Sequence, residues 1–72
     1  MNAETFKGQW NQLAGRLRSQ WGKLTDDDVQ RVDGDLQRLQ GLVQERYGIA
    51  REEAQMEVER FLDAQESSAK RH

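Results

Sequence analysis

Large apolar side chains recur near the start of this chain at intervals of three and four residues. They are Phe6, Trp10, Leu13, Leu17 and Trp21. This spacing places all five on one stripe of an amphipathic helix. The chain contains no proline, so nothing in its composition breaks a helix strongly. We predict one helix that carries the stripe and ends at Gly22, in the left-handed conformation that glycine adopts at helix ends.

The next stretch contains a helix start signal. Thr25 and Asp28 form a Thr-x-x-Asp variant of the capping box, and Leu24 and Val29 stand at the positions of a hydrophobic staple. Three consecutive aspartates open the first turn, where the helix dipole favours negative charge. We predict a short second helix that ends or bends near Gly34.

Two further helices follow from the same kind of spacing. The third carries Leu36, Leu39, Val43 and Tyr47 and ends at Gly48. The fourth follows Ala50, a poor cap, and its apolar stripe consists of Ala54, Val58, Phe61 and Leu62. No large apolar residue follows Leu62, so we predict a single domain over residues 1–64 and a disordered tail over residues 65–72.

The first and third helices share an internal repeat with an offset of 26 residues. The offset pairs Leu13 with Leu39, Gly15 with Gly41, Leu17 with Val43, Trp21 with Tyr47, and Gly22 with Gly48. Each copy is a helix–glycine–helix unit, and two such units can close a common core. The fold class predicted is therefore all-α, a small four-helix bundle built from two helical hairpins.

The composition of the chain argues against several classes of function. Among the 72 residues, 11 are basic and 13 acidic, and none is cysteine. The net charge of −2 argues against a general nucleic-acid binder, and the lack of cysteine excludes disulfides and thiolate metal sites. The polar N-terminus has no secretory signal, and no apolar run is long enough to span a membrane. We expect a cytoplasmic protein, a monomer, without a nucleic-acid partner.

The residues that could bind a metal or take part in catalysis have simpler structural explanations. The aspartates at positions 26–28, 33 and 35 lack calcium-loop spacing and fit a helix start instead. His72 is the terminal residue, and Ser19, Ser67 and Ser68 have no base near them in sequence. We predict no catalytic, cofactor-binding or metal-binding residue, no cofactor and no enzymatic activity.

Four cations near the N-terminus allow more than one interpretation. Lys7, Arg16, Arg18 and Lys23 oppose only Glu4 in the first 24 residues. They fall on both edges of the apolar stripe, as expected where aliphatic stems flank a core. We interpret the four cations as side chains that flank the core, and Trp10, Trp21 and Tyr47 as core residues. An interfacial amphipathic helix and nucleic-acid contact stay open as alternatives.

Two strings, QWGKLTDDD at residues 20–28 and QERYGIAREEA at residues 44–54, resemble the CsbD-like family of small bacterial proteins. The resemblance runs from about Phe6 to Phe61. It implies a fold similar to the two orthogonal α-hairpins of SAM-like domains. It also implies a general stress-response role, and it supplies no catalytic residues.

We therefore predict a non-enzymatic stress-response protein whose molecular activity is left open. One hypothesis is a soluble protectant that acts through abundance and solvation. An alternative is an interaction module that binds a partner protein or itself, with Leu42 and Met56 as the apolar residues that could lie outside the core. A second alternative is weak polyanion or membrane-surface binding through the first helix. The identity of any partner or client is not predicted.

Overall fold

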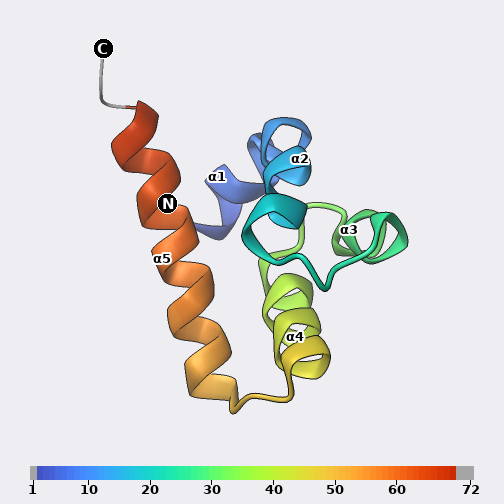
Figure 1. The fold of residues 1–72 in the computed structure, drawn as a ribbon. Coiled ribbons are helices and arrows are strands. Elements are labelled where there is room, and N and C mark those ends of the chain that lie inside the picture. The colour runs from blue at the N-terminus through green and yellow to red at the C-terminus, as the bar shows by residue number, and fades with distance from the viewer. Residues whose placement is uncertain (1, 70–72) are drawn as a thin grey trace.

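The computed structural model describes residues 2–69, with side chains through residue 66. Over this range the chain forms five helices and no strand. They are α1 (Ala3–Gly8), α2 (Trp10–Gln20), α3 (Asp26–Val32), α4 (Leu36–Tyr47) and α5 (Arg51–Ala69) (Figure 1). The prediction of an all-α fold is confirmed, but the number of helices in this range is five, not four.

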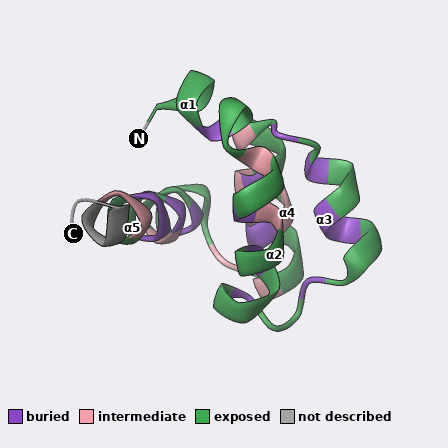
Figure 2. Cartoon of the chain, turned by 90° about the horizontal axis from the view of Figure 1, so that it is seen from above, coloured by how far each residue is buried: buried purple, intermediate pink, exposed green. Residues whose placement is uncertain are grey.

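Helix α5 is the longest element and forms one side of the molecule. It runs antiparallel to α4, to which a short loop joins it, and the two make the most extensive helix–helix contact (Figure 1). Seen from above, α2 and α4 lie between α5 and α3, so that the core is enclosed from both sides (Figure 2). The outward side of α5 faces no other helix.

The predicted first helix is in fact two helices. The chain leaves helical geometry at Gln9, with φ −105° and ψ 14°, directly after Gly8. Glycine weakens a helix interior because it loses the most backbone freedom on folding. The bend brings α1 against both α2 and α4. Phe6 becomes fully buried, and its ring centroid lies 5.5 Å from that of Trp10.

The core draws on every helix and on the α2–α3 connection. Its buried members are Phe6, Leu13, Leu17, Trp21, Leu24, Val29, Val32, Leu39, Val43, Ala54, Val58, Phe61 and Leu62. These include the apolar positions predicted for each stripe, apart from Trp10, Leu36 and Tyr47, which are half-buried and pack against the core. Burying one large aliphatic or aromatic side chain contributes about 1.5–3 kcal/mol. Only twelve of the thirteen buried side chains are of this size, because the other is Ala54, so each one matters to the fold.

The glycines predicted to end helices behave differently from one another. Gly48 has φ 61°, the left-handed conformation predicted for a helix end, and Gly34, near which the second helix was predicted to end or bend, has φ 79°. The prediction for Gly22 is wrong, because its φ is not positive and α2 ends at Trp21 in extended conformation, with φ −126° and ψ 90°. The extended backbone turns the Trp21 side chain into the core, and this burial decides how α2 ends.

Helix α3 begins as predicted. The Thr25 hydroxyl accepts a hydrogen bond from the Asp28 amide, and the Asp28 carboxylate accepts one from the Thr25 amide, each at 3.1 Å. At the other end of the chain, residues 65–69, which we expected to be a disordered tail, continue α5. Alanine, glutamine and glutamate are good helix formers, so the helix extends beyond its last core contact. Residues 70–72 lie outside the described range.

Candidate functional site

The most strongly held charged pair joins α3 to α4. The Asp28 carboxylate accepts hydrogen bonds from Arg46 Nε at 3.0 Å and from Nη2 at 2.8 Å. This fork-to-fork arrangement is the strongest geometry available to the pair. Asp28 is only 2% exposed, while the Arg46 side chain is 35% exposed. Asp28 thus caps its own helix and anchors a second one.

The electrostatics of Asp28 follow from these contacts. The Arg46 guanidinium, followed by the hydrogen bond from the Thr25 amide, holds the pKa of the Asp28 carboxyl well below its usual range. A carboxylate that stays ionised at every ordinary pH cannot serve as a proton donor. The pair therefore holds α3 against α4, and we assign it no catalytic role.

The aromatic residues lie in or against the core, as predicted. Trp21 is 2% exposed, its ring centroid lies 5.2 Å from that of Phe61, and its indole N–H donates to Glu57 at 3.1 Å. Tyr47 is half-buried, and its hydroxyl accepts a hydrogen bond from the Lys23 amide at 3.2 Å. The buried Trp21 ring therefore offers no free face on which a nucleic-acid base could stack.

Three of the four N-terminal cations have intramolecular partners. Arg16 donates to Gln65 on α5, and Arg18 pairs with Asp26 at 2.9 Å. The Lys23 ammonium lies 5.0 Å from the centre of the Tyr47 ring, within cation–π distance. These contacts connect α2 and the α2–α3 loop to other parts of the molecule, and the partner of Arg18 is a carboxylate.

Three of the five aspartates considered as metal ligands have intramolecular partners. Asp26 pairs with Arg18, Asp28 pairs with Arg46, and the Asp35 carboxylate caps α4 through the amides of Gln37 and Arg38. Within the described residues, no group of three or more acidic or histidine side chains is arranged to hold a metal ion. His72 and the side chains of Ser67 and Ser68 lie outside the described part.

The two apolar candidates for a contact surface have different environments. Leu42 is half-buried and packs against the core. Met56, on α5, is 52% exposed and is the one large hydrophobic residue exposed among those described. A shallow depression lies beside it, lined by Ala50, Glu52, Glu53, Met56, Glu57 and Arg60.

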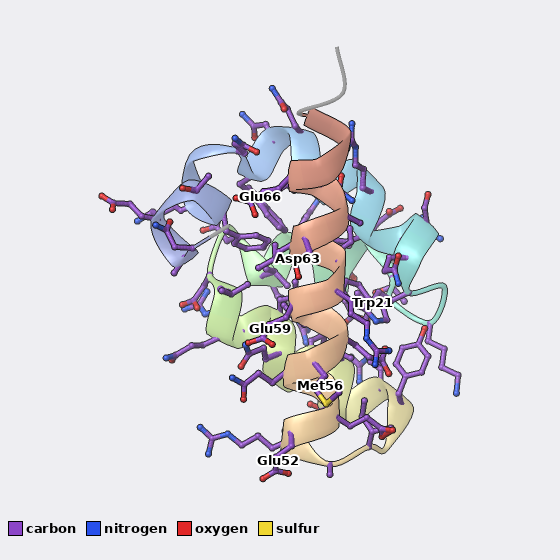
Figure 3. All side chains as sticks on the ribbon, turned by 90° about the vertical axis from the view of Figure 1, so that its left-hand side faces the viewer. Trp21, Glu52, Met56, Glu59, Asp63 and Glu66 are labelled. Atoms are coloured by element: carbon purple, nitrogen blue, oxygen red, sulfur yellow. The ribbon has the colours of Figure 1, made fainter. Side chains whose placement is uncertain are left out.

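Met56 stands within a line of carboxylates that our sequence analysis missed. Glu52, Met56, Glu59, Asp63 and Glu66 follow one another along the outward side of α5 (Figure 3). We call these five residues the α5 outer stripe. Their intervals of four, three, four and three residues are visible in the sequence and could have revealed the stripe, because this spacing keeps side chains on one helix face.

Comparison with known proteins gives the family. The sequence model of the CsbD-like family matches residues 4–56. The chain belongs to the CsbD-like family. Relatives include the UPF0337 protein PA4738 of Pseudomonas aeruginosa, 49% identical over 63 residues that cover 88% of this chain and 97% of the relative. The UPF0337 protein RB10934 of Rhodopirellula baltica is 57% identical over 61 residues, covering 85% and 90%.

A third relative is the UPF0337 protein ECA0631 of Pectobacterium atrosepticum, 44% identical over 63 residues that cover 88% of this chain and 91% of the relative. The resemblance noted from two short strings thus extends along nearly the whole described fold of this CsbD-like protein. In the described part of the chain, no helix is long and apolar enough to cross a membrane.

Proposed function

We propose that this CsbD-like protein is a non-enzymatic stress-response protein of the cytoplasm that acts as an interaction module, binding a partner protein through its folded surface. The observation that carries the proposal is Met56, which lies on the outward side of α5 with 52% of its surface exposed. Every other large apolar residue described is buried or half-buried. A thioether side chain adapts readily to the surface of a partner.

The hydrogen bonding of the buried polar groups supports a role without catalysis. Among the described residues, every buried side-chain nitrogen or oxygen has a hydrogen-bond partner. The one buried charge, Asp28, is paired with Arg46. Enzymes usually hold ionisable groups with perturbed pKa values in a cleft, whereas here the perturbed group stabilises a helix contact. The functional surface is therefore sought on the outside of the molecule.

The test is cross-linking of the full-length protein in stressed bacteria, with light scattering on the purified protein. Met56→Ala is compared with Gln55→Ala, a change at the neighbouring exposed position of the same helix. We expect a partner that wild type and Gln55→Ala capture and Met56→Ala loses. A monomer that captures no partner, or equal capture by both variants, would contradict the proposal.

A second candidate function is a soluble protectant, favoured by the polarity of the surface. A mean hydropathy of −1.06 and one exposed large apolar side chain among those described suit a protein that acts by solvation. Purified protein should then preserve the activity of an enzyme during drying better than an equal mass of inert protein. Equal preservation would remove this candidate.

No exposed side chain in the described part of the chain gives comparable support to the other alternative, weak binding of a polyanion or a membrane surface through the first predicted helix. Its apolar stripe is divided between α1 and α2 and faces the core, and Arg16, Arg18 and Lys23 have intramolecular partners. The likeness to the orthogonal hairpins of SAM-like domains remains a prediction from the resemblance.

A further inference from the structure

The net negative charge of residues 1–66 lies on one helix. Residues 1–50 carry seven acidic and seven basic side chains, whereas residues 51–66 of α5 carry six acidic and two basic ones. On the α5 outer stripe the segregation is complete, because the stripe consists of four acidic residues and Met56 (Figure 3). The core residues of α5, from Ala54 to Leu62, lie on its opposite side.

The stripe carries like charges at neighbouring positions. Glu59 and Asp63 are four residues apart, and Asp63 and Glu66 are three apart. Such pairs destabilise a helix by a few tenths of a kcal/mol each. Among the described residues, no ion pair joins Glu52, Glu59 or Asp63 to a basic side chain. The repulsion between Glu59 and Asp63 is therefore not neutralised by described cations, and a cationic partner would relieve it.

The geometry of the stripe fits a helix as its occupant. Intervals of four and three residues form a nearly straight seam along α5, the spacing that lets a second helix lie alongside at a small angle. From Glu52 to Glu66 the seam extends roughly 20 Å at about 1.5 Å per residue. Met56 provides an apolar contact near one end of this seam, where the shallow depression beside it is also found.

We infer that the α5 outer stripe docks a basic amphipathic helix of a partner protein. The partner places Lys or Arg side chains opposite Glu52, Glu59 and Asp63 and an apolar side chain on Met56. A second copy of this chain that met it through the same stripe is a poorer occupant, because acidic residues would then face acidic residues. Nucleic acids and anionic membranes carry the wrong charge. The inference rests on the proposed interaction module and specifies its surface and partner chemistry.

The experiment measures binding of the full-length protein to a labelled synthetic helical peptide of roughly four turns, with Lys on one face and one Leu among them. Its charge-reversed Glu counterpart is the control peptide. Glu59→Gln/Asp63→Asn is compared with Glu4→Gln/Asp27→Asn, which removes the same number of exposed carboxylates elsewhere. Met56→Ala tests the apolar contact. Far-ultraviolet circular dichroism confirms that each variant remains folded.

We expect the Lys peptide to bind in a salt-sensitive manner and the Glu peptide not to bind. The stripe variant should lose affinity about fivefold, consistent with the removal of two exposed charge pairs, and the control variant should lose less than about twofold. Met56→Ala should lose about threefold. Equal losses of affinity in the two double variants would show that the peptide is attracted only by the overall negative charge, which would overturn the inference. Failure of the Lys peptide to bind wild type would overturn it as well.

Two further outcomes separate this inference from the proposed function. Self-association that Glu59→Gln/Asp63→Asn abolishes would assign the stripe to a second copy and overturn the partner proposed here. A cellular partner captured equally by wild type and the stripe variant would overturn the inference while leaving the interaction module intact.

Discussion

Trp21 and Tyr47 hold equivalent places in the two repeat copies, yet the fold uses them differently. Trp21 lies inside the core, against Phe61, and its helix ends in extended backbone. Tyr47 lies at the rim, and its helix ends in the left-handed conformation of Gly48. The side chain that must reach the core determines the backbone after α2, whereas glycine determines it after α4. The repeated sequence pattern thus specifies both helices, whereas the backbone conformation at their C-terminal ends depends on tertiary contacts.

The largest expected effect concerns the two aromatic residues. Trp21→Ala removes the largest buried side chain and should lower the free energy of unfolding by about 3–5 kcal/mol, enough to unfold most molecules of a small domain. Tyr47→Ala should cost about 1–2 kcal/mol, because the ring is half-buried. Urea denaturation measures both. Equal losses would show that the two copies bury these side chains alike.

The two glycines give the next test. Gly48→Ala places a side chain at φ 61° and should cost about 1–2 kcal/mol. Gly22→Ala should change stability by less than about 0.5 kcal/mol, since Gly22 has no positive φ and a Cβ there meets no atom within 4 Å. Thermal unfolding of the two variants compares them directly. A large loss in Gly22→Ala would indicate a left-handed residue there after all.

Asp28 and Glu53 hold the third position of α3 and of α5, and of the two only Asp28 is buried. Because the Asp28 pKa lies below its usual range, its ionised form stabilises the fold above the ordinary aspartate pKa. That stabilisation is lost progressively as the pH falls below roughly 4. Asp28→Asn should be less stable at neutral pH and should show a smaller further loss in acid. Urea midpoints measured across this pH range check the prediction, and parallel pH curves would contradict it.

Gly15 and Gly41 are the paired glycines inside α2 and α4. A Cβ at either position meets no atom within 4 Å, and neither has a positive φ. Gly15→Ala and Gly41→Ala should each raise stability by about 0.5–1 kcal/mol. Thermal midpoints should rise in both. A fall in one copy alone would reveal a difference between α2 and α4 that the backbone does not show.

Local signals in the sequence predicted much of this fold. The capping box at Thr25 and the stop at Gly48 depend on a few adjacent residues, and both are confirmed. Gly8 is a local signal for the break at Gln9, but the apolar stripe that crosses it predicted a single helix. The ending at Trp21 accompanies the contact with Phe61 on α5, which no local pattern specifies. The ion pair between Asp28 and Arg46 joins residues 18 apart in the chain. It was likewise not predictable from the local sequence around either residue.

The candidate surface was only partly predictable. Met56 was named as one of two residues that could lie outside the core, and it is exposed, whereas Leu42 is half-buried. Helix spacing alone could not separate the two, because Leu42 is flanked by elements whose positions depend on the whole fold. The carboxylates around Met56 were present in the sequence at regular intervals and needed only to be plotted on a helix.

Helices α2 to α5 pack chiefly on near neighbours in the chain, most extensively α5 on α4, whereas α1 packs on both α2 and α4. Chains whose contacts are local fold quickly, on the microsecond to millisecond scale. The contact between Trp21 and Phe61 closes a much longer segment, so quenching or shielding of that indole should mark the last stage of refolding. A molecule unfolded by transient heat or acid would thus regain its shape almost as soon as conditions recover.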